Sequence, residues 1–367
     1  MSWPNIKLGD ACTFVRGPFG GALKKEFFVD DGFSVYEQQH AIYKQFDDVR
    51  YFVGERKFKE LKRFELNPGD LIMSCSGTMG KIAVVPQGIR RGVINQALLK
   101  LTPKRNVNLD YLKYWLESET FQFMLNGNTH GAAIKNVASV ATLKEMSIPL
   151  PPLPEQKRIA AILDKADAIR RKRQQAIQLA DDFLRAVFLD MFGDPVTNPK
   201  GWEMRKWCNV LKIVNGKNQK AVEDEAGAYP ICGSGGFMAK ANNWLTEANS
   251  VIIGRKGNIN SPILMRERFW NVDTAFGLEP KREALSHNYL FWFCKFFDFE
   301  QLNKAVTIPS LTKTDLLQID IPLPSRDVQG NFDEVVERID MLSAKNEKTL
   351  SEQLFESLSQ KAFSGQL

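Results

Sequence analysis

The stretch Trp3-Pro-Asn-Ile-Lys7, followed by Phe14-Val15-x-Gly17, decides the fold because the chain repeats it. It returns as Trp202-Glu-Met-Arg-Lys206 and Ile213-Val214-x-Gly216, at a constant offset of 199 residues. Two later matches follow in the same order: Gly77-Thr-Met-Gly80-Lys81 with Gly254-Arg-Lys-Gly257-Asn258 at offset 177, and Ser147-Ile-Pro-Leu150 with Asp320-Ile-Pro-Leu323 at offset 173. This period exceeds the roughly 20 to 50 residues of solenoids and propellers. The sequence therefore predicts two similar, domain-sized modules.

Each module predicts an α+β fold. Short apolar runs bounded by glycine or proline are typical of strands. They occur at Asp70–Cys75, Lys81–Val85, Ser250–Gly254 and Ile263–Met265. Tyr111–Leu116 and its counterpart Asn288–Cys294 predict one helix per module. Because the offset falls by 22 between Gly17 and Gly77, we expect the first module to carry an insert.

The composition argues against several classes of protein. At 367 residues, 44% of them hydrophobic, the chain can form two domains with cores of their own. No run reaches the roughly 18 apolar residues of a membrane span, and the N-terminus lacks a signal-peptide pattern, so we expect a cytoplasmic protein. Five scattered cysteines and three isolated histidines (His40, His130, His287) show no metal-ligand spacing. The net charge of +6 is compatible with a polyanionic partner, although solubility alone would explain it.

Two long amphipathic segments follow the modules. Residues 154–192 carry apolar side chains at spacings of three and four, which is typical of a helix or coiled-coil strand. Pro154 and Glu155 suit the first turn of this helix, and Gly193 with Pro195 suits its end. Residues 326–367 show a similar pattern before Gly365. A helix of 39 residues would be on the order of 58 Å long, which a single small domain rarely requires.

The charges of these segments favour their pairing. Residues 157–173 carry seven basic and two acidic side chains, whereas residues 327–363 carry eight acidic and four basic ones. Since each segment follows an equivalent module, we expect an antiparallel coiled coil with pseudo-twofold symmetry. The basic run Arg170–Arg173 either pairs with the acidic helix, forms a solvated face, or contacts phosphate or a partner. The apolar residues predicted to pair the helices are Ile159, Ile162, Ile169, Phe183, Phe332, Ile339, Leu342 and Leu354.

Glycine-rich turns are the first candidates for contact with a phosphate backbone, because such turns present N–H groups, hydroxyls and cations. A plain hairpin turn is the alternative. The first turn is not a P-loop, since Cys75 stands where a glycine is needed and Ile82 where Ser or Thr is needed. The candidate residues are Ser76, Thr78, Lys81, Arg255, Lys256 and Asn258.

Amide and guanidinium groups on other loops form a second set of candidates, since these groups distinguish bases by paired hydrogen bonds. Ordinary turn chemistry explains an Asn or Gly in such loops equally well. The amide and guanidinium candidates are Arg16, Gln38, Gln39, Asn95 and Gln96. Lys217 and Thr274, polar residues on loops of the second module, are added to this set.

The junction between the first module and the first long helix carries a family resemblance. The segment Ser147-Ile-Pro-Leu-Pro-Pro-Leu-Pro-Glu-Gln-Lys-Arg-Ile-Ala-Ala-Ile162 resembles a signature of the DNA specificity subunits of type I restriction–modification systems. The resemblance covers the whole chain, because that family has two target-recognition domains, each followed by a conserved helix. It implies recognition domains at residues 1–153 and 193–325, and spacer helices at residues 154–192 and 326–367.

The resemblance also implies a function. Each recognition domain would read one half of an asymmetric, interrupted DNA site, while the paired helices would fix the gap and dock modification subunits. The implied subunit is non-catalytic and binds no cofactor itself. Its implied partners are double-stranded DNA, modification subunits that methylate adenine with S-adenosylmethionine, and restriction subunits that use ATP and Mg²⁺.

The second module departs from the family pattern. Its junction, Ile321–Gln329, lacks the Pro-Pro-Leu-x-Glu-Gln form, which makes the start of the second helix harder to place from the sequence, and the module is shorter. A coiled-coil scaffold, or a DNA-binding adaptor without a restriction role, would also account for the helices, but a scaffold gains nothing from varying one module's insert. A self-contained DNA-modifying enzyme would need a catalytic motif, and neither Asn-Pro-Pro-aromatic nor Gly-x-Gly-x-x-Gly occurs.

Overall fold

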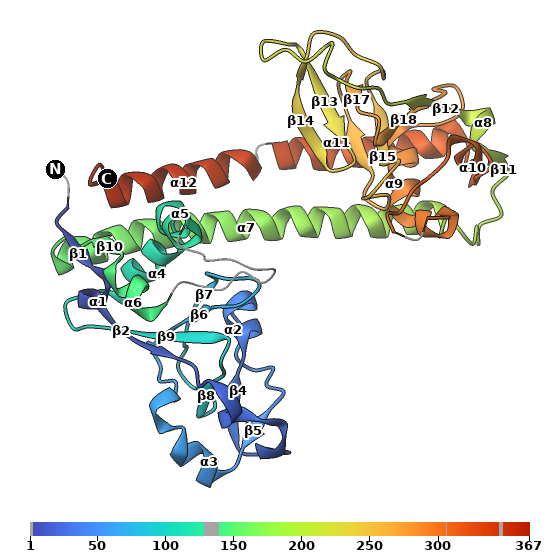
Figure 1. Ribbon diagram of the computed structural model, residues 1–367. Helices are drawn as coiled ribbons and strands as arrows, with labels where there is room; N and C mark the ends of the chain where they lie inside the picture. Colours follow the sequence, from blue (N-terminus) through green and yellow to red (C-terminus); the bar gives the residue numbers. More distant parts are fainter. Residues whose placement is uncertain (1–2, 128–138, 306, 345–347) are drawn as a thin grey trace. The chain divides into compact units, whose positions relative to one another are not determined.

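The computed structural model describes residues 3–127, 139–305, 307–344 and 348–367 and divides into two compact units. Unit 1 comprises Met1–Arg173 and Lys348–Leu367, and unit 2 comprises Gln174–Glu347. Each unit holds one predicted module with parts of the long helical segments. The boundary falls inside helix α7 (Leu153–Phe192), so this helix contributes residues to both units (Figure 1).

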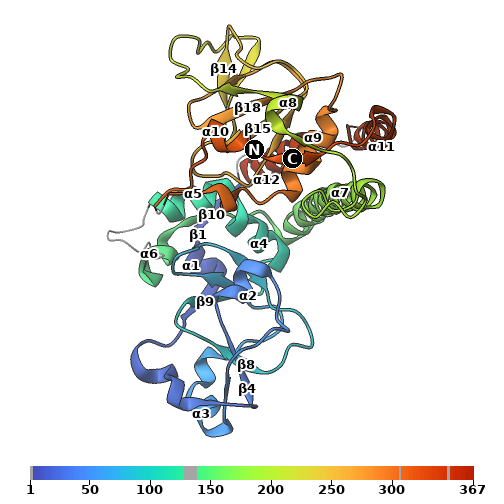
Figure 2. The same ribbon diagram turned by 90° about the vertical axis from the view of Figure 1, so that its right-hand side faces the viewer.

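Unit 1 contains a main antiparallel sheet in the order β2-β9-β6-β7 and a second sheet in the order β3-β5-β4-β8. The second sheet lies farther from α7 than the main sheet in both views (Figures 1 and 2). A short pair, β1-β10, joins the two ends of the module. The strands are β1 (Asn5–Lys7), β2 (Cys12–Arg16), β3 (Phe28–Val29), β4 (Phe33–Tyr36), β5 (Phe52–Val53), β6 (Leu71–Ser74), β7 (Ile82–Val84), β8 (Gly92–Ile94), β9 (Leu98–Pro103) and β10 (Ser147–Pro149).

Helix α4 of unit 1 supplies Tyr111 and Trp115 to the core, and the far end of the chain covers both rings. The Phe363 ring in α12 lies 5.4 Å from Tyr111 and 5.1 Å from Trp115, centroid to centroid. The Trp3 indole donates to the Ala362 carbonyl at 3.2 Å. The C-terminal helix therefore completes the core of the first module. The helices are α1 (Leu8–Ala11), α2 (Gln38–Tyr43), α3 (Glu55–Glu60), α4 (Leu109–Glu117), α5 (Glu119–Gly127), α6 (Val140–Glu145) and α12 (Lys348–Ser364).

Within unit 1, α12 runs antiparallel to the first part of α7 (Figure 1). Arg158, near the start of α7, donates to the carbonyl of Leu367 at 2.9 Å. Arg170, twelve residues later, lies over the ring of Phe355, 5.2 Å from its centroid. The antiparallel pairing predicted from the charges is thus present here.

Unit 2 repeats the main sheet as β12-β18-β15-β16, with a smaller sheet, β14-β13-β17, and a short pair, β11-β19. Its α7 contribution packs on α9 and α11: the Phe188 ring lies 5.4 Å from Tyr289 and 5.5 Å from Phe332. Trp202 donates to the Phe192 carbonyl at 3.0 Å, as Trp3 does to Ala362. The elements are β11 (Met204–Lys206), α8 (Trp207–Val210), β12 (Leu211–Asn215), β13 (Tyr229–Gly233), β14 (Gly236–Ala241), β15 (Ser250–Gly254), β16 (Ile263–Met265), β17 (Trp270–Asn271), β18 (Ala275–Pro280), α9 (His287–Phe296), α10 (Lys313–Leu316), β19 (Asp320–Pro322) and α11 (Arg326–Ala344).

The predicted secondary structure is confirmed in type. The four predicted strands appear as β6, β7, β15 and β16, and the two predicted helices as α4 and α9. Helix α7 ends before Gly193, which adopts the left-handed conformation (φ 76°) expected of a C-terminal glycine. The second long segment forms α11 and α12, and residues 345–347 between them lie outside the described residues.

The second long helix begins clearly despite its altered junction sequence. Helix α11 starts at Arg326, and Gln329 in its first turn makes the same three kinds of hydrogen bond as Gln156 in α7. Gln329 therefore keeps the contacts that Gln156 makes at the first junction, although the rest of the motif is absent.

The strand pairings correct one part of the repeat. In the pairing of β6 with β9 and of β15 with β18, Leu71 and Val251 occupy equivalent positions, which are 180 residues apart. Gly77 (φ 64°) therefore matches Gly257 (φ 80°) rather than Gly254, which belongs to strand β15. The predicted match was wrong by three residues because glycines alone do not define the register of a hairpin. The offset falls from 199 to 180, so the insert is 19 residues rather than 22.

The predicted helix-pairing residues divide into two groups. Ile159 and Phe332 are fully buried, and Ile162 and Ile339 are half-buried. The other four are at least half exposed, so packing within the two units buries only part of the predicted pairing surface: Ile169, Phe183, Leu342 and Leu354. The reason is that α4 and α9 also pack on the long helices, which rotates the buried face away from a simple two-helix stripe.

Candidate DNA interface

Two glycines from the sequence repeat bring the first strand of each main sheet against a neighbouring loop. A Cβ placed on Gly17 would lie 1.8 Å from the carbonyl oxygen of Asn95. A Cβ on Gly216 would lie 1.8 Å from the carbonyl oxygen of Val272. Only glycine permits this approach. The repeated glycine thus positions the ends of β2 and β12 beside the loops that lead into β9 and β18.

In unit 1, three loops meet where Gly17 lies against Asn95. The Cys75 N–H donates to the Ala97 carbonyl at 2.9 Å, which joins the turn after β6 to the loop before β9. Arg16 lies beside Cys75: burial raises the pKa of the Cys75 thiol to about 12, and the positive charge of Arg16 opposes that rise. Asn95 accepts from the Ala97 N–H at 3.0 Å. The structure therefore brings together the predicted residues Arg16, Ser76, Thr78, Lys81, Asn95 and Gln96, of which Thr78, Lys81 and Gln96 are exposed.

Helix α2 lies beside this cluster, because the Tyr36 carbonyl at the end of β4 accepts from the Asn95 N–H at 2.9 Å. Gln38 and Gln39 in its first turn are half-buried, and the Gln39 amide donates to the Asp48 carbonyl at 3.3 Å. His40 is buried, and its ring accepts from the Glu37 N–H at 2.9 Å, so it caps the helix. The predicted glutamines therefore lie near the cluster, but both are half-buried and Gln39 is hydrogen-bonded within the module.

Unit 2 builds an equivalent cluster. The Thr274 carbonyl accepts from the N–H groups of Arg255 and Lys256 at 2.8 and 3.2 Å. The Lys217 N–H donates to the Asn271 carbonyl at 3.0 Å, which adds the loop after β12. Asn258 lies in the same turn as Arg255, and its amide is 3.5 Å from the Ser234 carbonyl. All five predicted residues of this module therefore come together, with Lys217, Lys256 and Asn258 exposed.

Large exposed apolar side chains beside both clusters were missed by the sequence analysis. Phe19 is 71% exposed, and its ring centroid lies 5.9 Å from the Arg16 guanidinium. Phe237 is 65% exposed at the start of β14, next to Met238. No periodic pattern marks these residues, because they stand at strand ends and turns.

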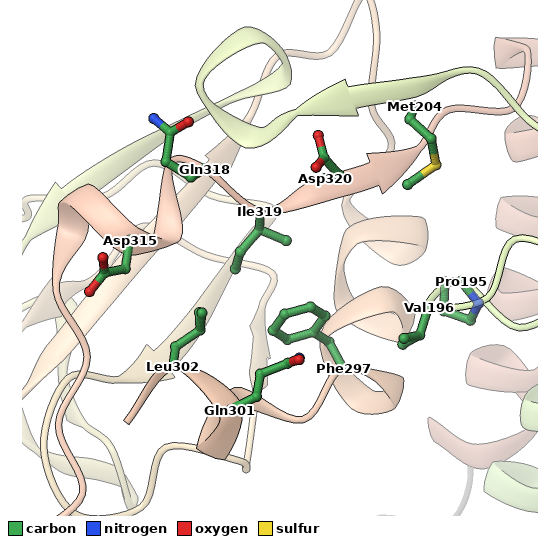
Figure 3. Close-up of a pocket in the computed structure, with 10 residues that line it drawn as sticks. All are labelled: Pro195, Val196, Met204, Phe297, Gln301, Leu302, Asp315, Gln318, Ile319 and Asp320. Atoms are coloured by element: carbon green, nitrogen blue, oxygen red, sulfur yellow. The ribbon is translucent and has the colours of Figure 1, made fainter. Parts of the chain in front are cut away.

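A pocket of about 270 Å³ in unit 2 lies beside the β11-β19 pair, and no predicted DNA-binding residue lines it. Figure 3 shows Phe297, Leu302 and Ile319 turned toward one another inside it. Asp315 and Asp320 also line it and are paired with Lys304 and Lys206. An apolar floor with two carboxylates does not suit a phosphate backbone, so the loop clusters are the better DNA interface.

Other classes of site find little support among the described residues. They contain no group of three or more His, Cys, Asp or Glu side chains able to hold a metal ion. His130 lies outside the described residues. His287 is partly buried, its ring 2.5 Å from an Arg266 nitrogen, and burial, reinforced by that charge, lowers its pKa. Within the same part of the chain, no helix is long and apolar enough to cross a membrane.

The family model for the type I restriction modification DNA specificity domain matches residues 2–179 and 199–356. The chain therefore belongs to this family and carries two copies of its domain, one in each half of the sequence repeat. It is a DNA specificity subunit by family, and its predicted α+β class is confirmed.

Curated relatives agree with the family. The chain is 24% identical over 392 residues to the type I restriction enzyme MjaVIII specificity subunit of Methanocaldococcus jannaschii, covering 93% of this chain and 86% of that protein. It is 22% identical over 335 residues to the putative MjaX specificity subunit of the same organism, covering 79% and 76%. The match to that organism's MjaIX specificity subunit, 24% over 181 residues, spans 45% of this chain and 41% of the relative.

Solved structures share the fold. The S subunit of the type I restriction–modification system from M. genitalium has a TM-score of 0.62 at 16% identity, covering 99% of this chain and 96% of that one. A chain from a study of complex assembly and conformational transition of the type I system has a TM-score of 0.50 at 18% identity, covering 100% and 98%. At this identity the likeness establishes the fold alone.

Proposed function

We propose that this chain directs a type I restriction–modification complex to a two-part DNA site, with one half read by each unit. The supporting observation is that both units gather exposed cations and amides at the same end of equivalent sheets. Cations and backbone N–H groups suit phosphates, whereas amides and guanidinium groups suit base edges. The two clusters differ in residue type, so the two half-sites would differ in sequence.

The long helices would hold the two units at a set spacing and dock modification subunits. Supporting this, Ile169, Phe183 and Leu354 on these helices are about half exposed. Apolar side chains that a fold leaves at its surface are candidates for burial against a partner. A partner subunit would cover them.

Catalysis would belong to those partners. Modification subunits would use S-adenosylmethionine to methylate adenine, and restriction subunits would use ATP and Mg²⁺, while this chain supplies DNA binding and sequence choice. The complex would act in the cytoplasm, where the DNA is.

A genome-wide map of methylated adenines tests the proposal, with the gene intact and with it deleted. We expect one two-part motif to lose its methylation on deletion and to regain it when the gene is restored on a plasmid. An unchanged map, in a cell where the partner subunits are expressed and active, would contradict the proposed function.

A further inference from the structure

The two main sheets have the same register, which makes individual loop residues comparable. In unit 1, Leu99 pairs with Arg16 on one side and with Met73 on the other. In unit 2, Phe276 pairs with Asn215 on one side and with Ile253 on the other. Arg16 is therefore equivalent to Asn215, at the end of the first strand of each sheet.

A second pair of equivalent residues lies on the other side of the central strand, which is β9 in unit 1 and β18 in unit 2. Two residues beyond Met73 and Ile253 stand Cys75 and Arg255, and each donates its backbone N–H to the loop before the central strand, at 2.9 and 2.8 Å. Unit 1 thus has arginine at the first position and cysteine at the second. Unit 2 has asparagine at the first position and arginine at the second. Each unit therefore has one guanidinium at these two positions, and the two units supply it from opposite sides of the central strand.

The two guanidinium groups converge on the same part of the cluster. Arg16 reaches across to lie beside Cys75, the position from which Arg255 originates in unit 2. Arg255 donates to the Asp273 carbonyl at 3.4 Å, and its guanidinium lies 5.8 Å from the Phe276 ring centroid. Phe276 occupies the position of Leu99, opposite Arg16. The side chains leave different strands, and both lie over the junction of the same loops.

The two arginine side chains are partly enclosed by neighbouring groups, whereas the lysines around them extend into solvent. Both arginines are half-buried, while Lys81, Lys217 and Lys256 are exposed. A side chain fixed by its neighbours loses little entropy on binding, and its planar fork matches O6 and N7 of guanine. Exposed lysines are point charges suited to phosphates.

We propose that Arg16 and Arg255 are the corresponding base-reading residues of the two domains and that each contacts guanine in the major groove of its half-site. The inference rests on the proposed function and deepens it. The residues around each arginine differ between the domains. Both domains nevertheless place a guanidinium at the same loops, although the arginine comes from a different sequence position in each. Each half-site then contains a G·C pair whose identity depends on that one arginine.

Unit 2 permits a transfer experiment, because Asn215 is exposed and occupies the position equivalent to Arg16. The complete complex, expressed with its modification and restriction subunits, is analysed by mapping methylated adenines. In Arg255→Cys, we expect discrimination at one G·C pair of one half-site to fall by on the order of 10- to 100-fold. In Arg255→Cys with Asn215→Arg, which recreates the unit 1 arrangement, we expect discrimination at that pair to return. The control is Arg255→Cys with Asn209→Arg. It restores the positive charge at an exposed position on α8, so we expect no recovery of discrimination at that pair.

The other half-site is the internal control for folding and assembly. Its sequence preference should be unchanged in all three variants, and Arg16→Asn should relax one G·C pair in that half alone. If Arg255→Cys abolishes methylation, Arg255→Lys, which keeps the charge and loses the fork, should still relax the same pair. An unchanged motif in Arg255→Cys, or equal rescue by Asn209→Arg, overturns the inference while leaving the proposed function intact. A wild-type gene that directs no two-part motif overturns both.

Discussion

Gln156 and Gln329 hold the same place in the two units and make matching hydrogen bonds. The Gln156 carboxamide oxygen accepts from the N–H of Asn108 at 2.8 Å, and that of Gln329 accepts from the N–H of Ser286 at 2.7 Å. Each amide nitrogen then donates to two carbonyls, including that of the proline ahead of its helix, at 2.8 Å. Each glutamine thus locks the start of a long helix to the N-cap of the module helix, α4 or α9.

Replacing either glutamine with alanine should loosen its own unit. Gln156→Ala leaves one buried donor and two carbonyls unpaired, which should cost about 2 to 3 kcal/mol of unfolding free energy. Hydrogen exchange should show faster opening of α4 for Gln156→Ala and of α9 for Gln329→Ala. Gln178→Ala is the control, since that amide donates to the exposed Asp182 on the same helix. Equal protection in all three variants would refute the locking role.

Two phenylalanines on α7 should differ sharply in their contribution to stability. Phe188 is fully buried among the rings of Phe192, Tyr289, Phe296 and Phe332, whereas Phe183 is 50% exposed. Phe188→Ala should cost about 3 to 5 kcal/mol because it leaves a cavity. Phe183→Ala should cost less than about 1 kcal/mol in the isolated chain. Denaturant unfolding measures both, and a larger loss for Phe183→Ala would contradict the packing described above.

The last helix should stabilise the first module. Phe363→Ala removes ring contacts with Tyr111 and Trp115 and should cost about 2 to 4 kcal/mol in unit 1. The matched control is Leu354→Ala, which truncates an exposed side chain on the same helix. Hydrogen exchange over residues 109–117 is the measurement. Faster exchange there in Phe363→Ala alone is expected, and an effect confined to residues 348–364 would argue against it.

Acidification should weaken unit 2 through His287. Burial, together with the charges of Arg266, Arg282 and Arg326, lowers the pKa of His287, and the charge of Asp333 opposes this shift. The unfolded chain therefore binds a proton more readily than the folded one, so stability falls as the pH drops below about 6.5. Hydrogen exchange of α9 between about pH 7.5 and 5.5 should show this loss. His287→Gln should remove most of that pH dependence, and an identical slope in the variant would exclude His287 as its source.

Turn lysines should contribute affinity without sequence choice. Lys81→Ala or Lys256→Ala should weaken DNA binding by the complex with its modification subunit on every sequence, and reduce the salt slope by about 1, because one fewer counterion is released. Lys206→Ala is the control for charge, since Lys206 pairs with Asp320 away from the loop cluster. Titrations on specific and unrelated duplexes at several salt concentrations would decide, and a change of preferred sequence would count against a phosphate contact.

Local chemistry and repetition made much of this fold predictable. The Phe-Val-x-Gly repeat predicts two related modules, and the close approach at Gly17 and Gly216 explains why glycine is needed in both. The start and end of α7 follow from a proline in the first turn and a glycine after the last. Gln329 could also have been found, since it follows Gln156 by 173 residues, the offset of the neighbouring Ile-Pro-Leu segments.

By itself, the sequence determined the two-module layout, the long helices, the α+β class and most of the loops that carry polar groups, because these depend on spacing and on residues near one another in the chain. Tertiary structure alone decided that Gly77 matches Gly257, that Phe183 is exposed while Phe188 is buried, and that the last helix completes the first core. It also decided that Arg16 and Arg255 meet equivalent loops from different strands. The physical reason is that strand register and helix rotation are set by partners far away in the chain, which no local pattern records.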